Sequence, residues 1–262
     1  MMLKQMWTYR GFILGNVRRE FQIKYQRSLL GSLWAIIHPL TLIFIYTVIF
    51  SQLMQTKLPG VGSTFSYSIY LCAGVLTWGL FSEITTRMQT IFIEHANLLK
   101  KLNFPWSCLP AVVVCSAVIN FLIVFGLFSL FLVVTGQFPG WVYWGLWPLL
   151  VLQVIFAVGL GICLAILNVF FRDVGQLFSI LIQFWFWLTP IVYPSKILPE
   201  SIRYWIELNP MTVLITAYQD ILVRGTLPEW TSLMGVICIS LCLCCLAWVL
   251  YRQHAGDMVD EL

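Results

Sequence analysis

The chain has 262 residues, of which 60% are hydrophobic and only 10% are charged, and its formal net charge is +4. Soluble domains carry about 25% charged residues, and no stretch of this sequence long enough for a domain reaches that density. The composition therefore excludes a soluble enzyme and a nucleic-acid-binding domain. It predicts a single transmembrane domain over residues 1–262.

The longest uncharged segment runs from Leu102 to Phe171 without any Lys, Arg, Asp or Glu. A helical crossing takes about 20 mainly apolar residues, because the hydrocarbon core is about 30 Å thick. Backbone polar groups in lipid must be paired within the segment, so helices are expected, and the runs are too long for the alternating strands of a barrel. The predicted fold is an all-α integral membrane protein with six transmembrane helices, over residues 33–53, 66–88, 108–134, 146–170, 175–194 and 231–251.

The distribution of Lys and Arg predicts the orientation of these spans, because cytoplasmic loops carry an excess of positive residues. With six spans, eleven of the fifteen Lys and Arg residues fall on the side that holds both termini, and four fall on the opposite side. Both termini are therefore expected in the cytoplasm.

Residues 1–32 precede the first span, and residues 12–31 among them are predicted to form an amphipathic helix. Its apolar residues recur at spacings of three and four, which places them on one face: Leu14, Val17, Phe21, Tyr25 and Leu29. The opposite face carries Arg19, Glu20, Gln26 and Arg27. Such a helix lies in the membrane surface. It either anchors the chain to anionic lipid or guides an anionic lipid headgroup toward a transport path.

The loop between the second and third spans reads EHANLLKKLNFP, residues 94–105, and is too polar to face lipid. Its three leucines form the apolar side of a short predicted helix, with Lys100 and Lys101 pointing outward. Pro105 fits the start of the third span, where its missing N–H costs little. The loop is either a positively charged anchor or a docking element for a cytoplasmic partner.

The segment between the fifth and sixth spans contains an apolar run, Met211–Val223, that is too short to cross a bilayer. We expect two short helices, near 200–208 and 211–224, that re-enter the outer leaflet within residues 195–228. Gly225 is expected to end the second helix. The alternative is a surface loop with Tyr204 and Trp205 at the membrane interface.

Signatures of enzyme chemistry are missing from the sequence. There is no phosphate-binding loop of the form G-x-x-x-x-G-K-[ST], and the three histidines lie far apart. Glu83 and Arg87 are four residues apart near one end of the second span and are expected to pair on one helix face. The chain is therefore not expected to hydrolyse ATP or to hold a metal ion.

Aromatic residues form a continuous turn at 184–187 inside the fifth span, with the sequence FWFW. Successive residues of a helix differ by about 100° in direction, so at least one of these rings must face the bundle. The rings either pack in the core or offer apolar faces to sugar rings.

Five motifs occur in order along the chain. They are RREFQIKYQRSLLGSLWAIIHP at 18–39, NLLKKLNFP at 97–105, NVFFRDVGQ at 168–176, FWFWLTPIVYP at 184–194, and NP at 209–210 followed by YQDIL at 218–222. Together they resemble the permease subunit of ABC-2 type polysaccharide exporters, most closely the O-antigen branch. The resemblance covers essentially the whole chain.

The resemblance implies a homodimer that pairs with two copies of a cytoplasmic ABC ATPase, which would hold ATP and Mg²⁺. This chain would then bind no cofactor, catalyse no reaction and have no nucleic-acid partner. The implied cargo is O-antigen polysaccharide linked to undecaprenyl diphosphate, moved across the bacterial inner membrane. The resemblance likens residues 12–31 to the family's interfacial helix, residues 94–103 to its coupling helix and residues 190–225 to its periplasmic re-entrant helices.

The candidate site residues fall into two groups. Those expected to bind the lipid-linked substrate are Arg18, Arg19, Lys24, Arg27, Trp34, Phe184, Trp185, Trp187 and Tyr193. Those expected to couple to the ATPase are Glu94, Asn97, Leu98, Lys100 and Lys101. Arginine suits the first role because it recognises phosphate groups through paired hydrogen bonds.

Three other functions stay open at this point. The same class of transporter could export capsule, teichoic acid or a small drug. A membrane enzyme acting on lipid-linked sugars would use Asp220 as its candidate acid and would work without an ATPase. A passive channel or assembly factor would work without nucleotide.

Overall fold

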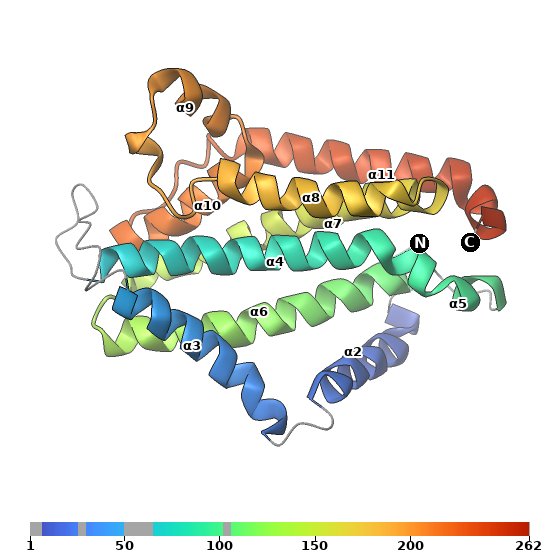
Figure 1. Ribbon diagram of the computed structural model, residues 1–262, viewed down its shortest axis with the longest axis horizontal. Helices are drawn as coiled ribbons and strands as arrows, with labels where there is room; N and C mark the ends of the chain where they lie inside the picture. The colour runs from blue at the N-terminus through green and yellow to red at the C-terminus, as the bar shows by residue number, and fades with distance from the viewer. Residues whose placement is uncertain (1–6, 26–29, 50–64, 102–105, 262) are drawn as a thin grey trace.

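The computed structural model describes residues 7–25, 30–49, 65–101 and 106–261, and every regular element among them is a helix. Four long helices run side by side (Figure 1): α4 (Ser66–Glu94), α6 (Cys108–Val134), α7 (Leu146–Phe170) and α11 (Met234–Glu261). The shorter apolar helices α3 (Trp34–Val48) and α8 (Asp173–Leu188) pack against α4. The predicted all-α fold is therefore confirmed over the described residues.

Each predicted span corresponds to an apolar helix. Among the described residues, four helices are long and apolar enough to cross a membrane: Ser66–Glu94, Cys108–Val134, Gly140–Phe170 and Met234–Met258. The third of these joins η3 (Gly140–Gly145) to α7. Helices α3 and α8, at the first and fifth predicted spans, are shorter. With 29 residues, α4 is roughly 43 Å long at 1.5 Å per residue, so it extends past a hydrocarbon core of about 30 Å.

Helix α7 lies between α4 and α11, and two of its glycines allow close approach from both sides. A Cβ at Gly161 would lie 2.7 Å from the Cβ of Met88 on α4. A Cβ at Gly159 would lie 3.0 Å from the Cβ of Leu243 on α11. Helices in lipid associate through such close packing, because the apolar surroundings supply no hydrophobic force between them.

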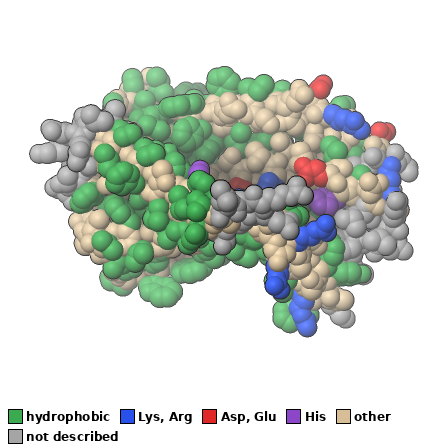
Figure 2. Space-filling view, turned by 60° about the horizontal axis from the view of Figure 1, so that its bottom comes forward, with side chains coloured by type: hydrophobic (Ala, Val, Ile, Leu, Met, Phe, Trp, Pro, Cys, Tyr) green, Lys and Arg blue, Asp and Glu red, His purple; other side chains and the backbone are tan. Residues whose placement is uncertain are grey.

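The two ends of the bundle differ in their elements and charges. Helix α5 (Ala96–Lys101) and the last turn of α11 lie at one end, and α9 (Glu200–Glu207) lies at the other (Figure 1). Figure 2 shows that, on the face in view, Lys, Arg, Asp and Glu gather toward the α5 end, while hydrophobic side chains dominate the other part. On this face the charged side chains therefore lie mainly toward one end of the bundle.

Helix α2 (Arg10–Tyr25) packs on α6 through Ile13 and Val17. Of the predicted apolar face, Val17 is buried in this contact, whereas Leu14 is 63% exposed. The predicted outward position of Glu20 was wrong, because its carboxylate contacts α4 and α6. The buried face of α2 depends on where α6 lies, and the periodicity of α2 alone does not contain that information.

Two short helices follow α8, close to the predicted ranges. They are α9 and α10 (Pro210–Gln219), and a π-helical turn, η5 (Asp220–Arg224), continues α10. Asn209 caps α10, because its Oδ1 accepts a hydrogen bond from the N–H of Met211 at 3.0 Å, and Pro210 takes the first helical position. Gly225 ends η5 with a φ of 64°, as predicted.

Replacing Gly161 with Ala is expected to destabilise the bundle. The new Cβ would lie 2.7 Å from the Cβ of Met88, so α4 and α7 must separate, at a cost of about 1–3 kcal/mol. Gly126→Ala in α6 is the matched control, because a Cβ there meets nothing within 4 Å. Thermal denaturation in detergent should give a lower Tm for Gly161→Ala than for the wild type, and an unchanged Tm for Gly126→Ala. Equal Tm values for the two variants would contradict the close α4–α7 contact.

Candidate functional site

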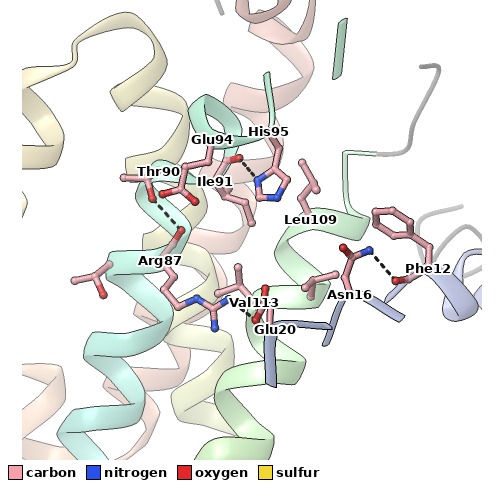
Figure 3. Close-up of a pocket in the computed structure, with 12 residues that line it drawn as sticks. Phe12, Asn16, Glu20, Arg87, Thr90, Ile91, Glu94, His95, Leu109 and Val113 are labelled. Atoms are coloured by element: carbon pink, nitrogen blue, oxygen red, sulfur yellow. Dashed lines mark hydrogen bonds and ion pairs between the residues drawn. The ribbon is translucent and has the colours of Figure 1, made fainter. Parts of the chain in front are cut away.

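A cleft of about 300 Å³ lies between α2, α4 and α6, toward the end of the bundle that carries α5 (Figure 3). Its α6 wall is apolar and its α4 wall is largely polar. The lining residues are Phe12, Asn16 and Glu20 from α2, Thr86, Arg87, Thr90, Ile91, Glu94 and His95 from α4 and its cap, and Leu109, Val112 and Val113 from α6.

An ion-pair cluster forms the inner edge of this cleft. The Nη2 of Arg87 lies 2.7 Å from the Oε2 of Glu20, and its Nη1 lies 3.7 Å from the Oε1 of Glu83. The hydroxyl of Ser116 donates to the same Glu20 oxygen at 2.6 Å, and the amide of Asn120 donates to Glu83 at 3.0 Å. The predicted Glu83–Arg87 pair is confirmed, but the shorter contact of Arg87 reaches α2. One arginine therefore joins α2 to α4, and α6 supports both carboxylates.

The charge balance of the cleft disfavours an anionic ligand. Arg87 is shared between the carboxylates of Glu20 and Glu83, and Glu94 adds a second carboxylate to the lining beside Glu20. A diphosphate placed among these described residues would meet more negative than positive charge, and a desolvated like-charge contact is costly. Within the described part of the chain, no group of three or more His, Cys, Asp and Glu residues is placed to hold a metal ion.

The described basic residues predicted to bind the substrate do not line this cleft. Arg18, Arg19 and Lys24 are all exposed, while Glu20 on the same helix turns inward to Arg87. Arg27 lies outside the described residues. Helix α2 thus presents exposed positive charge outward and uses its one acidic side chain to hold itself against the bundle.

The predicted coupling segment forms a short helix, α5, at the end of α4. His95 caps α4, and α5 then contacts both α4 and α11. Glu94, Asn97 and Lys100 are exposed there. The side chains of Leu98 and Lys101 lie outside the described part of the chain. The structure therefore supplies an exposed helix at the predicted position, and the role of its residues stays a prediction.

The aromatic turn of α8 divides between the interior and the surface. Trp185 turns inward and stands edge-on to Phe81 and Trp78, with ring centroids 5.2 and 6.2 Å away. Its indole N–H donates to the Oδ1 of Asn209 at 2.9 Å, so its one polar group is satisfied within the protein. Phe81 and Phe156 stack beneath it at 5.6 Å. The prediction that at least one ring faces the bundle is confirmed, and Trp185 has a clear packing role.

The other predicted substrate-binding rings lie closer to the surface. Phe184 and Trp187 are 64% and 63% exposed, and Trp34 on α3 is also exposed. Tyr193 is partly buried, and its hydroxyl donates to the carbonyl of Trp187 at 2.7 Å. The structure therefore does not bring the described members of the predicted substrate-binding set into one enclosed pocket. They are spread along α2, α3, α8 and the segment after α8.

The chain after α8 is fastened to α4 by hydrogen bonds that local sequence did not predict. The hydroxyl of Tyr70 donates to the carbonyl of Pro190 at 2.9 Å, and the hydroxyl of Tyr67 donates to the carbonyl of Val192. Gly74 makes this approach possible, because a Cβ there would lie 3.0 Å from Ile191 and 3.2 Å from the amide of Gln219. Tyrosines placed one turn apart near a helix end were the only available sign of such a contact.

These features define a multi-pass α-helical membrane protein with an exposed basic helix and a short exposed helix at the same end of the bundle. The chain belongs to the ABC-2 type transporter family, whose family model matches residues 13–223. Membership implies the membrane component of an ABC transporter that works with a separate ATPase.

Relatives with described roles agree with this assignment. The chain is 31% identical over its whole length to the O-antigen export system permease protein RfbA of Myxococcus xanthus, 99% of which is covered. It is 33% identical to an O-antigen export system permease protein RfbA of Klebsiella pneumoniae over 82% of each chain. It is 22% identical to the polysialic acid transport protein KpsM of Escherichia coli over 93% of each chain. Their names describe permeases and transport proteins, in line with the predicted non-enzymatic subunit.

Replacing Glu20 with Gln is expected to loosen α2 and lower the stability of the folded chain by about 1 kcal/mol, because a partly buried charge pair is lost. Glu207→Gln is the matched control. Its pair with Arg203 has the same 2.7 Å separation but joins exposed residues of one helix, and such pairs contribute little. Thermal denaturation of the purified protein compares the two. An equal change in both variants would show that the α2–α4 pair adds nothing beyond a surface pair.

Proposed function

We propose that this chain is the membrane subunit of an ATP-driven exporter that moves O-antigen polysaccharide, linked to undecaprenyl diphosphate, across the bacterial inner membrane. The observation that carries the proposal is the match along 100% of the chain to a protein named as an O-antigen export permease. Capsule export is the second candidate, supported by the more distant similarity to KpsM.

In this proposal two copies of the chain pair with two copies of a cytoplasmic ATPase. Each copy crosses the membrane six times, with α3 and α8 as the first and fifth crossings and both termini in the cytoplasm. Helices α9 and α10 re-enter the periplasmic leaflet. The burial of Met211, Leu214 and Ile215 supports a re-entrant α10, because these apolar residues face protein at the end of the bundle opposite α5.

Substrate recognition begins on the exposed face of α2. Arg18, Arg19 and Lys24 lie at the level of the lipid headgroups, Arg27 continues the series, and together they attract the diphosphate. The ion pairs of Arg87 support recognition by the exposed residues of α2, because the inward-facing guanidinium of Arg87 is already neutralised by Glu20 and Glu83. The sugar chain then follows the exposed rings of Trp34, Phe184 and Trp187 and passes Tyr193, while Trp185 shapes the wall behind them.

Coupling to ATP takes place at α5. The ATPase subunits hold ATP and Mg²⁺, and this chain binds no cofactor. Movement of the ATPase acts on Glu94, Asn97, Leu98, Lys100 and Lys101 at the exposed end of the bundle. The contacts of α5 with α4 and α11 support transmission into the membrane, since a short helix attached to two long ones cannot shift without displacing them.

This function is tested by deleting the gene for this chain in its source organism. O-antigen should disappear from lipopolysaccharide, and lipid-linked polysaccharide should accumulate in the cytoplasm, while capsule stays normal. Restoration by the wild-type gene controls for polar effects. Loss of capsule with normal O-antigen would establish the second candidate instead, and normal levels of both polysaccharides would contradict polysaccharide export.

The double variant Arg18→Gln, Arg19→Gln is expected to reduce O-antigen export roughly tenfold or more, because each charge-assisted hydrogen bond to a phosphate contributes about 1.5–3 kcal/mol. Surface O-antigen is the readout, with the abundance of the permease and the amount of co-purified ATPase measured in parallel. Arg203→Gln on α9 is the control, since that residue lies at the opposite end. Unchanged export at unchanged abundance would remove α2 from substrate recognition.

A further inference from the structure

The NVFFRDVGQ motif contains a side chain that joins three helices. Asn168 lies near the end of α7 and is only 3% exposed. Its Nδ2 donates to the backbone carbonyl of Gln89 on α4 at 2.9 Å, and its Oδ1 accepts from the backbone N–H of Gly175 on α8 at 3.0 Å. Both ends of one short amide are therefore used, and each end reaches a different helix.

The contact with α8 replaces the usual cap of that helix. The first N–H groups of a helix lack partners within it, and Arg172, at the N-cap position of α8, supplies no side-chain hydrogen bond. Asn168 satisfies the N–H of Gly175 from the preceding helix instead. A Cβ at Gly175 would lie 3.0 Å from the Oδ1 of Asn168, so the glycine allows this approach.

Helix α8 packs on the bundle along one face, where Trp185 stands edge-on to Phe81 and Trp78. Its buried residues are Phe178 and Ile182, whereas six large apolar residues on it are exposed: Leu177, Ile180, Leu181, Phe184, Trp187 and Leu188. At its other end, Asn209 binds the indole of Trp185 and donates to the hydroxyl of Thr189 at 3.0 Å. Two asparagines, one at each end, thus fix the position of a helix that packing holds only along one narrow face.

The α4 partner of Asn168 lies next to the proposed coupling helix. Gln89 is five residues before Glu94, the last residue of α4, and α5 begins at Ala96. A displacement of α5 must move this end of α4, and Asn168 connects the same end of α4 to the start of α8. We propose that Asn168 is a positioning residue that makes α8 follow the movement of α4 and α5 during ATP-driven export. This inference rests on the proposed function, in which α5 receives the movement of the ATPase.

A matched comparison separates this role from ordinary packing. Gln153 is another fully buried amide on α7, and its Nε2 donates to the carbonyl of Thr77 on α4 at 2.7 Å. It joins the same two helices but does not reach α8. Asn168→Leu and Gln153→Met each remove an amide link between α7 and α4 in a similar volume, and only the first also releases α8.

The experiment uses the complete transporter, this chain with its ATPase, in vesicles that contain undecaprenyl-diphosphate-linked polysaccharide. ATP hydrolysis, polysaccharide export and co-purified ATPase are measured for both variants. For Asn168→Leu, we expect normal assembly and normal ATP hydrolysis. Export per ATP hydrolysed should fall by about 5- to 30-fold, which is the size of change that typical coupling free energies produce. Gln153→Met should keep the wild-type ratio. Equal ratios in both variants would overturn the proposal.

A second variant covers the case in which Asn168→Leu does not assemble. Gly175→Ala keeps Asn168 but forces a Cβ to within 3.0 Å of its Oδ1, and it should lower the same ratio. Gly126→Ala is its control. A wild-type ratio in Gly175→Ala, or failure of both variants to assemble, would assign Asn168 to folding alone. Export by the wild-type chain in vesicles without the ATPase would instead overturn the proposed function, whatever the export-to-hydrolysis ratios of the variants are.

Discussion

The carboxylate of Glu20 accepts hydrogen bonds from Arg87 and Ser116, so one side chain of α2 is fixed to α4 and α6 together. Polar groups inside an apolar bundle are costly unless they are partnered. Several of these partners lie on another helix. Asn168 joins α7 to α4 and α8, and Asn209 joins α10 to α8. These links determine how the helices at the two ends of the bundle are placed, while apolar packing and close glycine contacts hold its middle.

The same pairing explains how the charges divide between the inside and the outside of α2. Because Glu20 and Glu83 compensate Arg87, the inward face of this region has no surplus of positive charge. Arg18 and Arg19 are exposed and make no ion pair within the described part of the chain, and in the proposed function their positive charge attracts an anionic headgroup. Helix α2 therefore uses Glu20 for attachment to the bundle and carries exposed positive charge at Arg18 and Arg19, to which the proposed function assigns recognition.

Local patterns in the sequence predicted which segments are helices, because chain length and apolar composition are enough to define a membrane helix. Prolines and a short apolar run also predicted the positions of α9 and α10, and a glycine predicted the end of η5 at Gly225. The partners of Glu20, Asn168 and Tyr70 did not follow, since each lies on a helix distant in the sequence. The inward direction of Trp185 likewise depends on where Phe81 and Asn209 are placed. The proposed recognition and coupling residues follow largely from the family resemblance, and the structure adds the exposure of those whose side chains it describes.

In the proposed function this chain provides the path and the coupling, while a separate ATPase provides the energy. The most direct test is transport of undecaprenyl-diphosphate-linked polysaccharide across vesicles that contain this chain, with and without the ATPase and Mg²⁺-ATP. The account predicts transport only when the ATPase, ATP and Mg²⁺ are all present, and none when the ATPase cannot hydrolyse ATP. Transport by this chain alone, at a rate similar to that of the complete transporter, would contradict it.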